Sequence, residues 1–489
     1  MQRLVKNFSK MALPARYLPP VHRGITQLDK SVFTRSIPLV VVSFPDPRNI
    51  SVFSKRFKDE ILRVPRVPHV VRLVDSPARV DGLPPLKKQM VANDNHVAKG
   101  VLLKDSVHRV EDVKQQLSAD AQAFLDECGA AVRDYNYTLD YEFYHADEIL
   151  RSVLPEEFLD EVPSGFTATG HVAHVNLRTE LKPYGSLIGQ VILDKNRQIE
   201  TVVDKVDAIA SQFRTFQMNV LAGRPDLVVS QRESNCTFTF DFSKVYWNSR
   251  LHTEHERLVR LFEPGQLVAD VFAGVGPFAI PAAKKEVLVL ANDLNPESFR
   301  YLRDNIAANK VDGFVRPKNL DGREFIRSSP ALLRDWTAQT GGSVTVAPAR
   351  RRRGAPPAPP RIVTLPRYFH HYVMNLPDSA LSFLNEFAGL YSRHGISEDA
   401  AADPAFVLPY IHCHCFEKYS PDEPEPAPAD LHARIHRRVL EIMHTSADIL
   451  PMTALSFHLV RKVAPTKPMF CVTFQLPQSI AFSPLATTT

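Results

Sequence analysis

The stretch ADVFAGVGPFAIPA, residues 269–282, carries the clearest structural signal in this chain. An apolar run typical of a buried strand leads into Gly274-x-Gly276, then Pro277, then an apolar helix start. Glycines let the backbone turn tightly and approach a ligand without a Cβ in the way, and proline suits the first turn of a helix. The stretch therefore predicts a strand, a ligand-binding turn and a helix, as at the start of a Rossmann-like sheet.

The next strand, VLVLAND, ends at Asp293. An acid at the end of the second strand of such a sheet accepts hydrogen bonds from ribose hydroxyls. Gly274-x-Gly276-x-x-Ala279 also matches the dinucleotide fingerprint. At this point the motif fits either NAD or S-adenosylmethionine, both of which contain a ribose.

Two later strand ends favour S-adenosylmethionine. FVRPKNLDGREFI predicts a third strand before Asp321 and Gly322, where an acid can face the adenine amino group. HHYVMNLPDSA predicts a fourth strand before Asn375-Leu376-Pro377. An Asn-x-Pro loop there is typical of methyltransferases that act on nitrogen, since the amide offers both a donor and an acceptor. Asp293 and Asp321 are also common turn residues, so only their joint spacing carries weight.

The composition fits a globular chain of several domains. The 489 residues are 44% apolar and 23% charged, with 59 basic and 54 acidic residues, a mild preference for polyanions. Five cysteines in so long a chain suggest a reducing compartment. The acid-poor residues 1–36 are typical of a mitochondrial presequence and equally of a plain basic tail, with Met11 as an alternative start. We expect no membrane span, and a chain in the mitochondrial matrix, nucleus and cytoplasm.

The order of strand-like and helix-like segments predicts an α/β protein. The expected parts are a Rossmann-like class I methyltransferase domain and, before it, two smaller α/β RNA-binding domains. Their predicted bounds are a basic extension at 1–36, a small domain at 37–130, a middle domain at 135–250 and the methyltransferase domain at 251–480. The Gly/Pro/Ala-rich residues 337–361, around Arg350 to Arg353, predict a disordered insertion.

IHCHCFEK at 411–418 has the residue types of a metal site. Alternation along a strand places His412 and His414 on one face and Cys413 and Cys415 on the other. Four ligands on two faces cannot share one ion, so no metal is expected.

Upstream of the glycine turn lie NLRTELKPYGSLIGQVILDKN (176–196) and FRTFQMNV…HTEHERLV (213–259). Together with VFAGVGPFAIPAA, ANDLNP, NLDGREFI and VMNLP, they resemble the archaeal and eukaryotic tRNA (guanine-37-N1)-methyltransferase family. The resemblance covers about residues 14–475. It implies a monomeric enzyme that binds the anticodon stem-loop and outer corner of tRNA. It also implies S-adenosylmethionine as cofactor and 1-methylguanosine as product, the first step toward wybutosine.

The resemblance also implies roles for particular residues. Arg214 matches the arginine that faces guanine O6, and Glu254 matches the proposed general base, with Asn375 and Pro377 positioning base and cofactor. The substrate-contacting set adds Tyr246, Asn248 and Arg250. The implied cofactor contacts are His255, Asp270, Phe272, Gly274, Gly276, Asp293, Leu294, Asp321, Gly322 and Asn375. His255 stands where archaeal relatives carry an arginine.

The chemistry explains why such residues are needed. N1 of neutral guanine carries a proton, so a base must remove it as the methyl group arrives, and Glu254 is our candidate. The negative charge then moves toward O6, where Arg214 can stabilise it. A solvated helix-face role for Glu254 and a stacked structural role for Arg214 are the ordinary alternatives.

Three other functions are weighed. Transfer of an aminocarboxypropyl group to a wyosine precursor uses a similar fold. A cytosine-carbon methyltransferase needs a cysteine nucleophile in the fourth-strand loop, and MNLPDSA has none. A non-catalytic RNA-binding protein would have no need of the acids in the cofactor cleft.

Overall fold

The computed structural model describes residues 13–73, 98–163, 165–205, 217–346 and 360–484. The chain divides into two compact units, Met1–Phe166 with Leu177–Arg197, and Thr167–Asn176 with Gln198–Thr489. The first unit ends inside the predicted middle domain 135–250, and the three-domain bounds therefore stay a prediction. Among the described residues, no helix combines the length and the apolar character needed to cross a membrane.

The first unit is built on a four-stranded antiparallel sheet of order β2-β3-β1-β4. Its strands are β1 (Arg35–Ser43), β2 (Val70–Arg72), β3 (Lys99–Leu102) and β4 (Ala131–Leu139). The run LVVV (39–42) in β1 is buried on both faces, as β-branched residues in a central strand favour. Phe44, Phe53 and Phe57 join its core, to which α1 (Arg48–Arg56) and α3 (Ala119–Glu127) contribute.

The first unit has one further longer helix, α5, and several short ones. They are α2 (Val113–Gln116), α4 (Ala146–Val153), α5 (Gly185–Lys195), η1 (Ala15–Tyr17), η2 (Lys30–Phe33), η3 (Val110–Asp112), η4 (Tyr141–Phe143), η5 (Glu156–Glu161) and η6 (Thr179–Tyr184).

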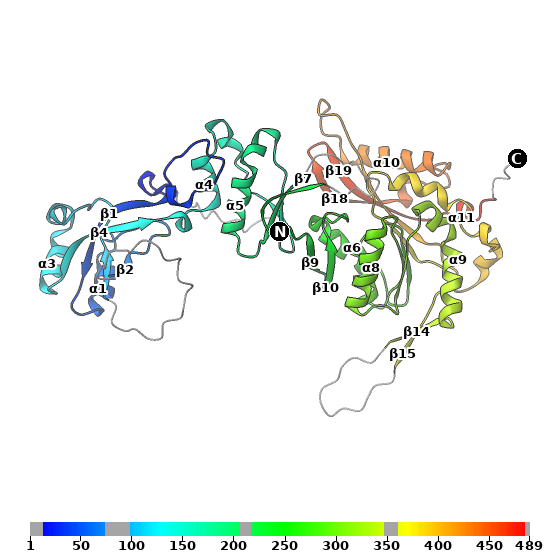
Figure 1. The fold of residues 1–489 in the computed structure, drawn as a ribbon. Coiled ribbons are helices and arrows are strands. Elements are labelled where there is room, and N and C mark those ends of the chain that lie inside the picture. Colours follow the sequence, from blue (N-terminus) through cyan, green and yellow to red (C-terminus); the bar gives the residue numbers. More distant parts are fainter. Residues whose placement is uncertain (1–12, 74–97, 164, 206–216, 347–359, 485–489) are drawn as a thin grey trace. The chain divides into compact units, whose positions relative to one another are not determined.

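The second unit begins with two small sheets. The first has the order β5-β6-β7-β8, and β9 pairs with β10 in a separate hairpin. Asn305 and Asn309 of α8 (Pro296–Asn309) accept hydrogen bonds from the N–H groups of Thr239 and Thr237 in β10, which seat the hairpin on that helix (Figure 1). The strands are β5 (Thr167–Thr169), β6 (Val172–Val175), β7 (Thr201–Lys205), β8 (Met218–Gly223), β9 (Val228–Glu233) and β10 (Cys236–Asp241).

The main sheet of the second unit has seven strands in the order β13-β12-β11-β16-β17-β19-β18. The first five run parallel and β19 runs antiparallel to both neighbours. A dinucleotide-binding sheet has the order 3-2-1-4-5-6, so the antiparallel hairpin inserted at the edge distinguishes this sheet. The strands are β11 (Leu267–Asp270), β12 (Leu288–Asn292), β13 (Val315–Lys318), β16 (His371–Met374), β17 (Tyr410–Phe416), β18 (Ser456–Ala464) and β19 (Lys467–Gln475).

Helices cover this sheet, since a parallel sheet must bury both faces. Besides α8, the helices of this part of the chain are α6 (His252–Leu261), α7 (Ala279–Lys284), α9 (Gly322–Thr340), α10 (Pro428–Ile442), α11 (Gln478–Ala481), and the 3-10 helices η7 (Ser249–Leu251), η8 (Ala380–Phe387), η9 (Ser392–His394), η10 (Glu398–Ala402) and η11 (Met452–Ala454).

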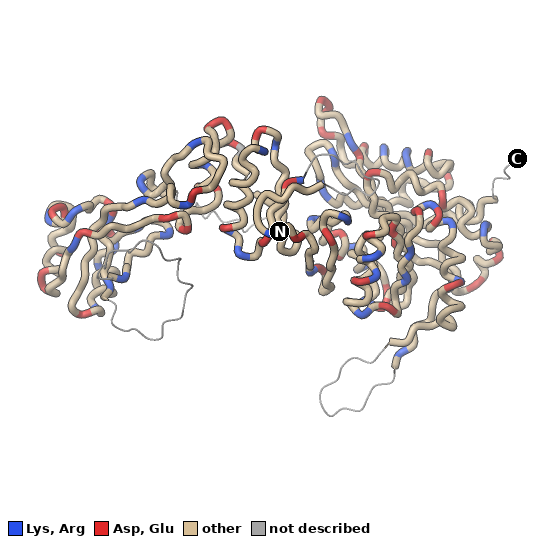
Figure 2. Tube along the Cα trace, viewed as in Figure 1, with Lys and Arg blue, Asp and Glu red and all other residues tan. Residues whose placement is uncertain are grey.

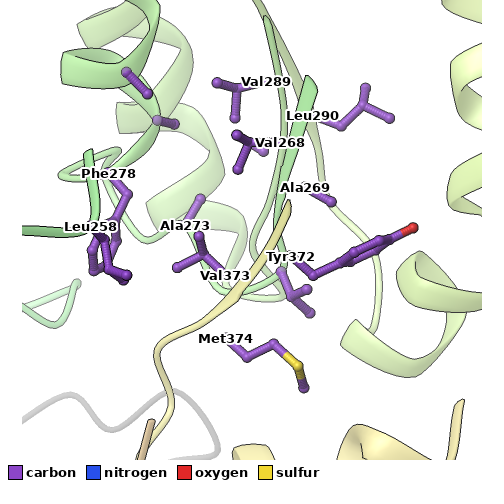
Figure 3. Packing of buried hydrophobic residues seen from close by; sticks show 14 of the residues in the cluster. Leu258, Val268, Ala269, Ala273, Phe278, Val289, Leu290, Tyr372, Val373 and Met374 are labelled. Carbon is purple, nitrogen blue, oxygen red and sulfur yellow. The ribbon is translucent and has the colours of Figure 1, made fainter. Parts of the chain in front are cut away.

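Alternating residues of the central strands supply both halves of the core. Figure 3 shows Val268 and Val373 on the side of Leu258 and Phe278, while Ala269 and Tyr372 lie on the opposite side. The Tyr372 hydroxyl meets the Ser329 hydroxyl of α9 at 2.7 Å. Asp270 is paired in register with Val373, and it therefore projects to the side covered by α6 and α7.

The predicted α/β class and the four predicted strands around the glycine turn are confirmed. The predicted insertion at 337–361 is wrong at its edges. Residues 337–340 complete α9, and β14 (Ser343–Val346) pairs with β15 (Arg361–Thr364). Gly341 ends α9 in the left-handed conformation, where glycine carries no steric penalty. Residues 347–359 lie outside the described residues.

Candidate active site

A cavity of about 420 Å³ opens at the carboxyl ends of the parallel strands. This is where open α/β sheets bind ligands, beside the point at which the strand order reverses, here between β11 and β16. Its lining residues are Tyr246, Asn248, Leu251, Phe272, Gly274, Asp293, Leu294, Asn295, Ser298, Asp321, Gly322, Asn375, Leu376, Pro377, Ser379, Phe383, Phe416, Val463 and Met469.

Asp293, which directly follows the neighbouring strand β12, holds the glycine turn in place through a hydrogen bond. Gly274 has a φ of +54° and Gly276 a φ of +102°. The Gly274 N–H donates to Asp293 Oδ2 at 2.8 Å, and the Asn295 N–H donates to Asp293 Oδ1 at 2.9 Å. A Cβ on Gly276 would lie 2.8 Å from the Ile280 side chain, whereas one on Gly274 would meet nothing within 4 Å. The turn is therefore packed behind Gly276 and open at Gly274, as a ligand cradle requires.

One wall of the cavity is aromatic. Phe272 and Phe383 make an edge contact with ring centroids 5.0 Å apart. A Cβ on Gly322 would lie 2.8 Å from Phe272 and 3.1 Å from Phe383, so glycine lets the rings approach the start of α9. Arg323 lies over the Phe383 ring at 4.5 Å. The Asp321 side chain accepts the Arg323 N–H at 2.8 Å and caps α9.

Two side chains at this end of the sheet have acceptor oxygens without a partner among the described residues: Asn375 lines the cavity, whereas Asp270, a predicted cofactor contact, does not. Neither carboxylate oxygen of Asp270 meets a hydrogen-bond donor in good geometry, although its side chain is fully buried, and Asn375 Oδ1 is also buried and unpaired. Burial and the neighbouring Asp293 raise the pKa of Asp270 to about 8, and the nearby Phe272 amide offsets this only in part. Burial raises the pKa of Asp293 to about 6 against the opposing Asn295 and Gly274 amides.

Glu254 has the opposite surroundings. Arg257 donates from Nε to Oε2 at 2.6 Å and from a terminal nitrogen to Oε1 at 2.8 Å. His414 Nε2 meets Oε1 at 2.8 Å, and His458 Nε2 lies 3.5 Å from Oε2. Burial alone would raise the pKa of Glu254, but the bonds from Arg257 and His414 outweigh it and lower that pKa to about 2. Glu254 is only 2% exposed and does not line the cavity.

His414 completes this paired cluster. Burial would lower its pKa, but the neighbouring Cys471 and the hydrogen bond to Glu254 raise it to about 10. One donor atom each of Glu254, His414 and Cys471 lies within 4.8 Å of the others, which is close enough to share a metal ion. Since Arg257 already binds both carboxylate oxygens, a cation there would have to displace a guanidinium.

The other predicted residues are dispersed around the cavity. His255 Nδ1 lies 2.5 Å from Glu233 Oε1 and its ring meets Phe278 edge-on, so His255 faces the hairpin and does not line the cavity. Asn248 caps η7 and its Nδ2 lies 3.4 Å from the Tyr246 hydroxyl. Arg250 is exposed, with one terminal nitrogen 3.3 Å from Thr167 Oγ1. Their predicted roles stay predictions, and Arg214 lies outside the described residues.

Several lining residues escaped the sequence analysis. Phe383 comes from η8 and Phe416, Val463 and Met469 come from the last three strands of the sheet. None of them stands in a ligand-binding motif. The position of Phe416 directly after the HCHC segment was the one available signal, because β17 ends at the same edge as β16.

The sheet order, the glycine turn and the acids at successive strand ends define a Rossmann-like methyltransferase fold. Family comparison agrees: residues 229–332 match the TRM5/TYW2 methyltransferase domain and residues 146–226 match the TYW2 N-terminal domain. Among solved structures, Trm5b from Pyrococcus abyssi superposes with a TM-score of 0.50 at 20% identity, covering 90% of this chain and 99% of that one.

Full-length relatives identify the family. The chain is 56% identical to the tRNA (guanine(37)-N(1))-methyltransferase of Saccharomyces cerevisiae over 487 residues, 96% of each chain. It is 42% identical to the protein of the same name from Schizosaccharomyces pombe, covering 94% of this chain and 96% of that one. The chain belongs to the tRNA (guanine(37)-N(1))-methyltransferase family.

Proposed function

We propose that this chain methylates N1 of guanosine 37 in tRNA with S-adenosylmethionine as the methyl donor. The product is 1-methylguanosine on the 3′ side of the anticodon, the first step toward wybutosine. The observation that carries the proposal is the cavity at the strand switch point, which joins the glycine turn, Asp293, Asp321 and Asn375-Leu376-Pro377. Full-length similarity to relatives named for this reaction supports it.

The cavity fits S-adenosylmethionine, which supplies a methyl carbon on positively charged sulfur when bound. Asp293 and Asp321 present carboxylates at the ends of the second and third strands, where ribose hydroxyls and an adenine amino group find acceptors. The Phe272–Phe383 wall offers an apolar surface to a purine ring. The unpaired Oδ1 of Asn375, which lines the cavity, calls for a ligand that brings an N–H donor.

The proton on guanine N1 needs an acceptor, and Glu254 stays our predicted base. In the described arrangement its two oxygens are occupied by Arg257 and His414. A guanine N–H would therefore have to replace one of these partners, and release from Arg257 would also raise the basicity of the carboxylate. Pro377 is held in place because its carbonyl accepts the Phe416 N–H at 3.0 Å.

The proposed partner is the anticodon stem-loop and outer corner of tRNA, bound by a monomer. One structural neighbour of this fold is titled as a complex of aTrm5 with a leucine tRNA. Lysines and arginines are interspersed with acids along both units (Figure 2), and basic side chains attract phosphates regardless of sequence. The basic start of the chain supports a mitochondrial share beside the nucleus and cytoplasm. Imaging of chains started at Met1 and at Met11 tests that share.

The decisive experiment incubates the protein with labelled S-adenosylmethionine and tRNA carrying guanine or adenine at position 37, followed by nucleoside mass spectrometry. We expect 1-methylguanosine, a gain of one methylene, on the guanine substrate alone. Gain of an aminocarboxypropyl group would establish the alternative function, aminocarboxypropyl transfer to a wyosine precursor. We test for this group because residues 146–226 match the TYW2 N-terminal domain. Equal labelling of the adenine substrate would contradict the proposed pocket.

A further inference from the structure

Glu254, His414 and Cys471 bring three metal-ligating side chains to one point inside the second unit. One ligand atom of each lies within 4.8 Å of the others, and none of the three residues is more than 2% exposed. His414 and Cys471 are register partners on β17 and β19, and Glu254 reaches His414 from α6. Only His414 belongs to the HCHC segment, so this set differs from the four ligands that strand alternation excludes.

The geometry and the residue types of this set fit one small cation. His414 Nδ1 is buried and has no hydrogen-bond partner among the described residues. The Cys471 sulfur lies 3.9 Å from the Thr473 hydroxyl, which is a long contact. A thiolate, an imidazole and a carboxylate are ligands that Zn²⁺ binds, and the bond lengths of a tetrahedral ion separate its ligand atoms by about 3.5 Å. The three side chains are therefore close to the required spacing.

Arg257 occupies the position that an ion would take. It donates to the two Glu254 oxygens at 2.6 Å and 2.8 Å, and it also interacts with the Cys471 side chain. The Arg257 side chain is 28% exposed, so it can swing into solvent while the strands stay in place. Beside it, His458 is 45% exposed and its Nε2 lies 3.5 Å from Glu254 Oε2. The buried cluster therefore has an entry route for a cation.

The exchange preserves a counter-charge for Glu254. A divalent cation supplies the positive charge that the guanidinium gives up, and it also gains a bond to sulfur that a guanidinium cannot form. Sulfur ligands favour cations such as Zn²⁺ and Co²⁺. Mg²⁺ prefers oxygen ligands and octahedral geometry, so the Mg²⁺ that accompanies tRNA should not compete.

We propose that Glu254, His414 and Cys471 form a binding site for a thiophilic divalent cation of the Zn²⁺ class, which enters in exchange for Arg257. Cys471 binds as a thiolate, His414 as a neutral imidazole and Glu254 as a carboxylate. The protons that these groups give up pass to solvent, and no electron is transferred. Because Glu254 is the predicted base, the bound ion should also inhibit methyl transfer. This last consequence rests on the proposed function.

The test titrates the full chain, without tRNA, with Co²⁺, whose bond to a thiolate absorbs in the near ultraviolet. We expect a single bound Co²⁺ that Zn²⁺ displaces and Mg²⁺ does not. Cys471→Ser should abolish the thiolate absorption and weaken binding by about tenfold or more. The matched control is Cys128→Ser, which removes a partly exposed thiol of the first unit and should change neither.

A second variant tests the exchange itself. Arg257→Gln removes the competing guanidinium, so it should tighten Co²⁺ binding by about tenfold. A residue with a purely structural role would not have this effect. Zn²⁺ should inhibit tRNA methylation by the wild type, EDTA should restore it, and Cys471→Ser should resist the inhibition.

Each outcome has a distinct meaning. Absence of the thiolate absorption in the wild type, or its persistence in Cys471→Ser, would overturn the site. Unchanged or weaker Co²⁺ binding by folded Arg257→Gln would overturn the exchange, and this variant also decides if Cys471→Ser does not fold. Bound Zn²⁺ without inhibition would overturn the link to Glu254. A protein that binds Co²⁺ as expected but never methylates tRNA would contradict the proposed function and leave the metal site intact.

Discussion

Glu254 and Asp270 are both acids buried against the same side of the main sheet, yet their surroundings are opposite. Both oxygens of Glu254 bind Arg257, and His414 adds a further bond. Among the described residues, neither oxygen of Asp270 meets a donor in good geometry. Burial therefore does not by itself set the behaviour of a carboxylate, because the donors around it decide whether the charge is kept or suppressed. The hydrogen bond between Glu254 and His414 links α6 to β17. The oxygens of Asp270 retain hydrogen-bonding capacity that a ligand could use.

The largest expected effect comes from breaking the paired cluster. Glu254→Ala leaves Arg257 and His414 without their carboxylate, which should cost about 3 kcal/mol of unfolding free energy. Turnover at saturating tRNA should fall at least tenfold, as loss of a general base implies, with cofactor affinity nearly unchanged. Urea denaturation and single-turnover methylation measure the two effects.

The matched control in the same helix is Glu256→Ala. Glu256 pairs with Arg260 at 3.0 Å on a more exposed surface, and its loss should cost about 0.5 kcal/mol or less. Wild-type turnover in a folded Glu254→Ala protein would leave Glu254 a purely structural role.

Replacing the unpaired acid, Asp270, should stabilise the protein, whereas replacing Glu254 should destabilise it. Since the folded pKa of Asp270, about 8, exceeds its ordinary value of 3.8, its contribution is complete below about pH 4 and is lost as pH rises through 8. Without cofactor, Asp270→Asn should therefore gain stability relative to wild type as pH rises, on the order of 1 kcal/mol per pH unit between pH 5 and pH 8. Chemical denaturation at pH 5 and pH 8 checks this, with Asp304→Asn, a change to an exposed carboxylate on α8, as the neutral reference. Lower stability of Asp270→Asn than of wild type at pH 8 would contradict the difference that we infer between Asp270 and Glu254.

The smallest effect tests how the paired acid is held. Arg257→Lys keeps the charge but replaces two parallel hydrogen bonds with a single donor, which should cost about 1 kcal/mol. Glu254 has its pKa lowered from 4.5 to about 2, so its stabilisation is present above pH 4.5 and is lost as pH falls toward 2. With Arg257→Lys the total stabilisation should be smaller and its loss complete at a higher pH, so the midpoint of acid unfolding should rise, which circular dichroism will show. An unchanged acid midpoint would mean that His414 alone sets the state of Glu254.

The glycine turn and the strand ends were predictable because their signals are local. Gly274 and Gly276 adopt the positive φ angles that such a turn requires. Asp293, Asp321 and Asn375 line the cavity because parallel strands bring their carboxyl ends to one edge. The HCHC alternation also follows from strand geometry. His412 bonds His371 and Thr473, and His414 bonds Glu254, on the face covered by α6.

The α/β order, the ligand-binding turn and the family could be predicted from the sequence, since each depends on short-range spacing or on motifs. Which of the buried acids are paired depends on the fold. Arg257 lies three positions after Glu254, but His414 reaches it from β17, 160 positions away. The sequence around Asp270 does not reveal that, among the described residues, no side chain donates a hydrogen bond to its carboxylate. The charge state of a buried group depends on neighbours that packing, and not chain order, brings within a few ångströms.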